Sequence, residues 1–130
     1  MGLDMWVSAN NDGNFEDCVH HYWRKAYIIQ DWFEEYAASQ GMTKKRGWHS
    51  DINCKFIQIP QTVLVDLINR CKKTSACGTN VLNELFPVRN WSSKVEVREC
   101  FNAVIDSIKP LEEVLRDHDW KKPLYFYSWW

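Results

Sequence analysis

Residues 20–36, HHYWRKAYIIQDWFEEY, combine two histidines, six aromatic rings and an Arg-Lys pair. A nucleotide site needs rings that stack on a base and cations that contact phosphate. The periodicity of Tyr22, Ala26, Ile29 and Phe33 predicts one amphipathic helix with these residues facing the core. The remaining side chains of the helix are therefore the candidates for ligand binding.

On that helical wheel, Lys25 and Trp32 lie on one flank of the core face, and Trp23 lies on the other. A lysine beside a tryptophan at a core boundary either extends its stem toward water or reaches into a pocket. For both tryptophans the alternative is a place at the core edge. Arg24 points away from the core, where a solvated ion pair is the alternative to a phosphate contact.

Histidine and cysteine spacing does not predict a metal site. His20 and His21 are adjacent, so on a helix they point about 100° apart and chelate poorly. His21, near the core flank, is a candidate ligand contact or general base, with a surface or core-edge histidine as the alternative. The five cysteines form no Cys-x-x-Cys and read as reduced thiols. Asp117-His118-Asp119 is expected to form a solvated cap after the last helix.

Two further aromatic segments could contribute to a site. In the closing YFYSWW, the alternation of a strand puts Tyr125, Tyr127 and Trp129 on one face, which is either core, groove or subunit interface. The basic segment Lys44–His49 suits a lid over phosphate, and a plain solvated loop is the alternative.

No catalytic residue, cofactor or metal is predicted. The sequence has no Gly-x-Ser-x-Gly, phosphate-binding P-loop, Gly-x-Gly-x-x-Gly or His-Glu-x-x-His. The net charge of −1 argues against binding to duplex nucleic acid, which needs a basic surface. No apolar run approaches the roughly 20 residues of a membrane span, so we expect a protein without membrane contact.

The elements that position these residues predict an α+β fold with one domain over residues 1–130. We expect a small, about three-stranded sheet packed against three main helices. The strands are predicted at residues 3–8, 55–59 and 124–130, and the helices at about residues 20–40, from Pro60 to a loop at Thr74, and from a capping box at Ser93. Pro110 lies inside the last helix and should kink or divide it.

Three segments together resemble a family of small bacteriophage proteins: Met1–Met5 (MGLDM), Tyr22–Ala26 (YWRKA) followed by Trp32-Phe33, and the closing Tyr-rich Ser-Trp tail. The order and spacing match along most of the chain, but the segments Lys44–His49 and Cys71–Cys77 depart from the family pattern. The resemblance implies a viral accessory protein in the cytoplasm of a bacterial host. Some members carry the label phosphoglycerate kinase, which is rejected because this chain is too short for that two-domain enzyme.

Small phage accessory proteins often counter host defence, so the leading expectation is a binding protein, acting as a homo-oligomer. It would sequester a small nucleotide-derived signal, cyclic or ADP-ribose-like. One alternative is an inhibitor that binds a host protein through the aromatic tail and the Trp48 loop. A second alternative is a small nucleotide phosphodiesterase or hydrolase. The candidate ligand-binding residues are His21, Trp23, Arg24, Lys25, Trp32, Tyr127 and Trp129.

Overall fold

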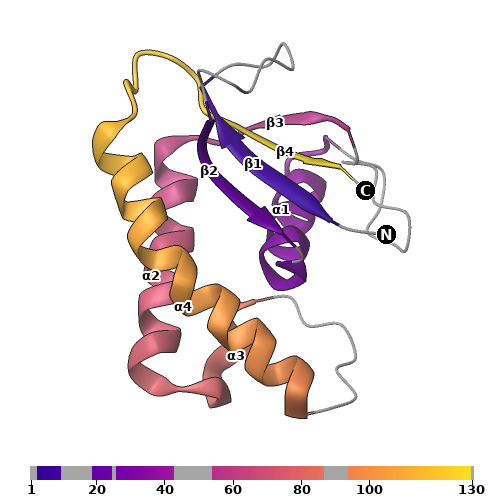
Figure 1. Cartoon of the computed structure of the whole chain (residues 1–130). Coiled ribbons are helices and arrows are strands. Elements are labelled where there is room, and N and C mark those ends of the chain that lie inside the picture. The colour runs from indigo at the N-terminus through magenta and orange to yellow at the C-terminus, as the bar shows by residue number, and fades with distance from the viewer. Residues whose placement is uncertain (1–2, 10–18, 25, 43–53, 87–93, 130) are drawn as a thin grey trace.

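A computed structural model describes residues 3–9, 19–24, 26–42, 54–86 and 94–129, with the backbone alone at 19–20 and 94–96. The described chain forms a four-stranded sheet and three main helices, with two short helical turns (Figure 1). In chain order the elements are β1 (Asp4–Ser8), β2 (Val19–Arg24), α1 (Tyr27–Ser39), β3 (Phe56–Gln58), α2 (Gln61–Cys77), η1 (Thr79–Val81), α3 (Leu82–Leu85), α4 (Lys94–Asp117) and β4 (Tyr125–Trp129). The predicted α+β class is confirmed, although the sheet has four strands rather than about three.

The sheet is antiparallel throughout, with strand order β2-β1-β4-β3. Side chains on a strand alternate between the two faces, and directly paired residues share a face. In β1 the alternation is clear, because Met5 and Val7 are buried whereas Asp4 and Trp6 are partly exposed. The sheet therefore has an inner face, which packs on the core, and an outer face.

The inner face is covered by α1 and α4. Phe33 of α1 stacks on Phe126 of β4 with ring centroids 3.9 Å apart. At the β2 edge of the sheet, the Trp23 indole N–H donates a 2.9 Å hydrogen bond to Ser107 Oγ of α4. Figure 1 shows α4 alongside α2, both extending well beyond the sheet. One core thus joins the inner sheet face to all three main helices.

The single helix predicted over residues 20–36 is wrong, because its first part is strand β2. Pairing with β1 satisfies the backbone groups on one side of the edge strand β2 and lets Trp23 bury its ring opposite Met5. Tyr22, expected at the centre of the core face, instead lies on the outer face with 45% of its surface exposed. The core assignment holds in the true helix, where Ile29 and Phe33 are buried.

The other helix boundaries also differ from expectation. α2 continues through the predicted loop at Thr74, whose buried hydroxyl donates to the Arg70 carbonyl, and it ends at Gly78 with φ of +83°. Pro110 does not divide α4, which runs unbroken from Lys94 to Asp117. Residues on both sides of the proline, including Val104 and Leu111, are buried in the core. This packing holds the helix together where one backbone hydrogen bond is missing.

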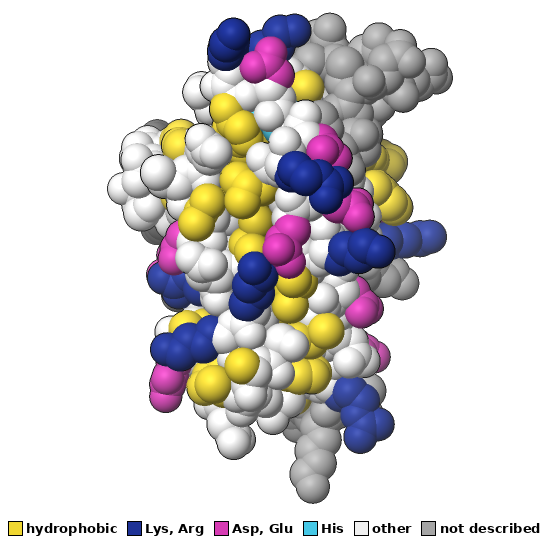
Figure 2. All heavy atoms as spheres, turned by 90° about the vertical axis from the view of Figure 1, so that its left-hand side faces the viewer, with side chains coloured by type: hydrophobic (Ala, Val, Ile, Leu, Met, Phe, Trp, Pro, Cys, Tyr) yellow, Lys and Arg dark blue, Asp and Glu magenta, His cyan; other side chains and the backbone are white. Residues whose placement is uncertain are grey.

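Charges of both signs are interspersed on the α4 side of the molecule. Figure 2 shows Lys and Arg side chains there among Asp and Glu, with hydrophobic side chains between them. One of the ion pairs, Lys72 to Glu112 at 3.2 Å, links α2 to α4. The described residues of this side therefore form no gathered basic patch of the kind that binds a phosphate backbone. Among the described helices, none is long and apolar enough to cross a membrane.

Candidate functional site

Six of the seven predicted binding residues lie in the described part of the chain, and these six do not form one site. They fall in three places: the inner sheet face, the outer sheet face and a pocket on the far side of α1. Lys25 lies outside the described residues, as does the Lys44–His49 loop. The division follows directly from the strand β2, because neighbouring residues on a strand point to opposite faces.

The inner face holds Trp23 and His21, which are two residues apart on β2. Trp23 is 7% exposed and anchored by its hydrogen bond to Ser107. His21 is half-buried and lies edge-on to the Trp23 ring, with centroids 4.3 Å apart. Trp23 is thus buried, as in the core-edge alternative, and both side chains pack between β2 and α4.

The environment of His21 favours its neutral form. Burial lowers the pKa of the imidazole below its ordinary value of 6.5, and the negative charge of Glu113 partly opposes this shift. A histidine that is neutral at neutral pH is a weak partner for phosphate. This geometry assigns His21 a structural role at the sheet–helix boundary.

The outer sheet face carries a continuous row of aromatic rings, one from each strand. Tyr22 on β2, Trp6 on β1, Tyr127 on β4 and Phe56 on β3 are successive partners in the strand register. The ring centroids are 5.6 Å apart from Tyr22 to Trp6, 5.7 Å from Trp6 to Tyr127 and 4.6 Å from Tyr127 to Phe56. We call these four side chains the ring row.

A second cross-strand row lies next to the ring row on the same face. Asp4 pairs with Arg24 on one side and with Trp129 on the other. Arg24 is exposed, and Trp129 has 54% of its surface exposed. The Tyr22 hydroxyl donates a hydrogen bond to the Asp4 carboxylate, which is the main reason that the pKa of Tyr22 is raised. A guanidinium and an open indole thus share one surface beside the ring row.

Tyr127 connects this surface to Cys54. Partial burial raises the pKa of the Tyr127 hydroxyl, and a hydrogen bond with the Cys54 side chain adds to the shift. The Cys54 backbone adopts a positive φ of 60°, and its N–H donates to the Ser128 carbonyl at 2.8 Å. Of the predicted binding residues, the outer sheet face therefore brings together Arg24, Tyr127 and Trp129.

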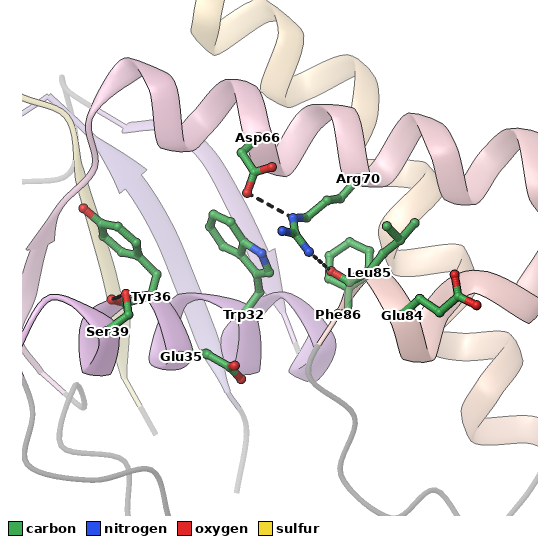
Figure 3. A pocket seen from close by; sticks show the side chains of 9 residues that line it. All are labelled: Trp32, Glu35, Tyr36, Ser39, Asp66, Arg70, Glu84, Leu85 and Phe86. Carbon is green, nitrogen blue, oxygen red and sulfur yellow. Dashed lines mark hydrogen bonds and ion pairs between the residues drawn. The ribbon is translucent and has the colours of Figure 1, made fainter.

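Trp32 lies on the opposite side of the core from the outer face, in the wall of a pocket between α1, α2 and α3. The pocket encloses about 290 Å³ and is lined by Trp32, Glu35, Tyr36, Ser39, Asp66, Arg70, Glu84, Leu85 and Phe86. Figure 3 shows Trp32 rising from α1 beside Arg70 of α2, with Tyr36 on the other side of Trp32. None of the other predicted binding residues in the described part of the chain lines this pocket.

The sequence did not identify Arg70 as a candidate site residue, nor the three side chains that accompany Tyr127 in the ring row. Arg70 lies within α2, and no local signal in the sequence distinguishes it from a solvated arginine. Its Nε contacts Asp66 at 3.0 Å, and its Nη1 donates to the Leu85 carbonyl at 2.6 Å. Trp6 had a readable signal, because strand alternation separates it from the apolar Met5 and Val7.

Metal-binding and cap predictions can be compared with the described residues. No group of three or more His, Cys, Asp or Glu side chains among them is placed to hold a metal ion. The predicted solvated cap is wrong at His118, which is 5% exposed. Its Nε2 lies 2.9 Å from the Lys122 carbonyl, and its ring packs edge-on against Trp120. The turn after α4 folds back over this histidine, which removes it from solvent.

No protein-family model matches the chain, and searches of curated proteins and of solved structures find no significant similarity. The resemblance to small bacteriophage proteins therefore stays an expectation from the sequence.

Proposed function

We propose that this protein is a non-catalytic binding protein for a small nucleotide-derived ligand, and that the outer sheet face is the surface that binds it. The observation that carries the proposal is the placement of the exposed Arg24 and Trp129 in one cross-strand row beside the ring row. The resemblance to phage proteins suggests what this ligand is: a host defence signal, cyclic or ADP-ribose-like. The protein sequesters it as a homo-oligomer in the bacterial cytoplasm.

The chemistry of the outer face supports stacking as the main source of affinity. Each base–aromatic stack contributes about 1–3 kcal/mol. Trp129 is open enough to receive a base, with 54% of its surface exposed, and Tyr127 lies next to it along the strand face. The rings come from paired strands, so they are held in place before the ligand arrives, which lowers the entropic cost of binding.

The charge of this face supports a ligand with few phosphates. Arg24 supplies a planar guanidinium suited to phosphate, whereas Asp4 in the neighbouring register position is acidic. The half-buried Asp4 carboxylate accepts a hydrogen bond from the Tyr22 hydroxyl, which orients that ring in the row. A nucleotide with its phosphate on Arg24 and its base on Trp129 fits this arrangement better than a long polyanion.

Isothermal titration calorimetry against cyclic dinucleotides and ADP-ribose derivatives tests the proposal. We expect Trp129→Ala to weaken binding by about 5-fold to 150-fold, which corresponds to the loss of one base stack. Tyr27→Ala is the matched control, because Tyr27 is also 54% exposed but lies on α1 outside the outer sheet face. Absence of binding across the panel, or equal losses in the two variants, would contradict the proposal.

The hydrolase alternative is separated from this proposal by the fate of the ligand. Each nucleotide that binds is incubated with the protein and then analysed by chromatography. A binding protein returns the ligand intact, whereas a phosphodiesterase or hydrolase converts it.

One observation favours a second candidate, an inhibitor that binds a host protein. Trp129 and Tyr22 together expose two large rings on the same sheet face, and Trp, Tyr and Arg dominate the energetics of protein interfaces. Pull-down from host lysate with the wild-type chain and the Trp129→Ala variant tests this candidate. A partner that is captured by wild type and lost in the variant, with no nucleotide bound in calorimetry, would replace the first proposal.

A further inference from the structure

Three chemically different side chains lie in one cross-strand row on the outer sheet face. Arg24 of β2 pairs with Asp4 of β1, and Asp4 pairs with Trp129 of β4. Paired strands lie about 4.8 Å apart, so Asp4 is midway between two backbone positions that are roughly 10 Å apart. The order of groups along this row is therefore a guanidinium, a carboxylate and an indole ring.

Asp4 is partly exposed and has acceptor capacity left for a ligand. Within the described part of the chain, the Tyr22 hydroxyl is its hydrogen-bond donor, and no ion pair joins Asp4 to Arg24. A carboxylate offers about four lone-pair positions, of which the Tyr22 hydroxyl occupies one. The remaining positions can accept hydrogen bonds from hydroxyl groups of a ligand.

The charges of Asp4 and Arg24 give the row a direction. The hydrogen bond to Asp4 is the main cause of the raised pKa of Tyr22, and the positive charge of Arg24 acts in the opposite direction. Both charged groups therefore lie near the same hydroxyl. A phosphate is attracted at the position of Arg24 and repelled at the position of Asp4. The row thus favours a nucleotide whose phosphate lies on the β2 side.

A nucleotide has a matching order of groups, because its ribose lies between the phosphate and the base. With the phosphate on Arg24 and the base on Trp129, the ribose lies over Asp4. A ribose presents hydroxyl donors, and a carboxylate accepts from a hydroxyl more strongly than a neutral acceptor does. The 2′-hydroxyl is also the group that distinguishes ribonucleotides from deoxyribonucleotides.

We propose that Asp4 recognises the ribose of the bound nucleotide by accepting hydrogen bonds from its 2′- and 3′-hydroxyls. This inference rests on the proposed function, in which the outer sheet face binds a nucleotide. The ligand class is then a ribonucleotide with a free vicinal diol. ADP-ribose carries such a diol, whereas a cyclic dinucleotide with 3′,5′ linkages has its 3′-oxygens esterified. ADP-ribose-like compounds are therefore the preferred ligands.

Isothermal titration calorimetry of the full chain with AMP, 2′-deoxy-AMP and 3′-deoxy-AMP tests this inference. The three probes share the base and the phosphate, so only the sugar contact changes. We expect AMP to bind about 10-fold more tightly than 2′-deoxy-AMP, which is the low end for a hydrogen bond to a charged group. The 3′-deoxy analogue should also bind more weakly than AMP. ADP-ribose and 3′,5′-cyclic di-AMP are titrated alongside, and ADP-ribose should bind more tightly.

The Asp4→Ala variant assigns the discrimination to this carboxylate. It removes the acceptor, so AMP and 2′-deoxy-AMP should bind the variant about equally. Asp106→Ala is the matched control, because Asp106 is an exposed residue of α4 and lies outside the outer sheet face. The control should retain the wild-type ratio of the two affinities. This ratio is the readout, since a general effect of net charge changes both affinities alike.

The outcomes separate this inference from the proposed function. Equal wild-type affinities for AMP and the two deoxy analogues would overturn the inference and leave nucleotide binding intact. Discrimination that persists in Asp4→Ala, or tighter binding of cyclic di-AMP than of ADP-ribose, would also overturn it. Absence of binding by every nucleotide tested would contradict the proposed function, and the inference with it. The wild-type comparison decides the question if Asp4→Ala does not fold.

Discussion

At the scale of single residues, the tryptophans of the sheet differ in whether a buried hydrogen bond holds the indole in the core. Trp23 and Trp129 are both aromatic residues of the sheet, yet the first is 7% exposed and hydrogen-bonded, and the second is 54% exposed. A buried indole N–H needs an acceptor, and Ser107 Oγ provides it while donating to the Ala103 carbonyl. The sheet thus uses the same residue type for packing and for presentation to solvent.

Replacing this acceptor should be costly. Ser107→Ala leaves the Trp23 N–H buried without a partner, so we expect the free energy of unfolding to fall by about 1–3 kcal/mol. Urea denaturation measures the change. Ser75→Ala, at an exposed position of α2, is the control and should stay within about 0.5 kcal/mol of wild type. Equal effects of the two substitutions would show that the buried hydrogen bond contributes nothing.

The lowered pKa of His21 predicts loss of stability on acidification. Burial disfavours the imidazolium in the folded state, whereas the unfolded chain protonates near the ordinary value of 6.5. Below that pH the unfolded state binds more protons, so the free energy of unfolding decreases as the pH falls.

Thermal melts between roughly pH 7.5 and pH 5.5, one unit on either side of the ordinary histidine pKa, measure this dependence. The His21→Gln variant lacks the titrating group, so its melting temperature should fall less over the same interval. An identical pH dependence in both proteins would rule out His21 as the source.

At the scale of elements, the end of α2 depends on backbone conformation. Gly78 has φ of 83° and ψ of −169°, a region that essentially only glycine occupies, and its N–H donates to the Thr74 carbonyl at 2.8 Å. This residue stops α2 and turns the chain into η1 and α3. Because α3 supplies Glu84 and Leu85, the same turn places one wall of the pocket.

Gly78→Ala should therefore destabilise the fold by about 1–3 kcal/mol through backbone strain. An added Cβ meets no atom within 4 Å, so steric overlap does not contribute. Chemical denaturation measures the loss, and Asn80→Ala, an exposed position in η1, is the comparison. If Gly78→Ala left the free energy of unfolding unchanged, the turn would have relaxed to an ordinary conformation without cost.

The elements also show how far the sequence could be interpreted. Strands β1, β3 and β4 and the start of helix α2 follow their local patterns, because their apolar spacing matches one period only. Residues 20–36 fit a helical period through Tyr22, Ala26 and Ile29, yet the first part pairs with β1. Local periodicity carries no information about that pairing. The predicted helix therefore placed Tyr22 in the core and Trp23 at its flank, whereas Tyr22 is exposed and Trp23 is buried.

At the scale of the whole molecule, two cysteines of α2 report on cooperative unfolding. Cys71 is fully buried, and burial raises the pKa of its thiol to about 12, whereas Cys77 at the end of the same helix is exposed. The thiolate is the reactive species, so native Cys71 is protected twice, by access and by protonation.

We expect an alkylating reagent at mildly alkaline pH to modify Cys77 rapidly and Cys71 only as the chain unfolds. Peptide mass spectrometry across a urea series measures both rates in the same sample. Modification of Cys71 should follow the global transition seen by circular dichroism. Modification of Cys71 at the rate of Cys77 without urea would show that the α2–α4 contact opens locally.

The sequence by itself determined the α+β class, three of the four strands, the presence of the three main helices and the aromatic character of the last strand. These features depend on local spacing and on the types of neighbouring residues. Only the tertiary structure decided that Trp23 is a hydrogen-bonded core residue, that Arg24 and Trp129 share the outer face, and that Trp32 meets Arg70 in a pocket. Such contacts join residues far apart in the chain, and no local pattern encodes which distant element will supply the partner.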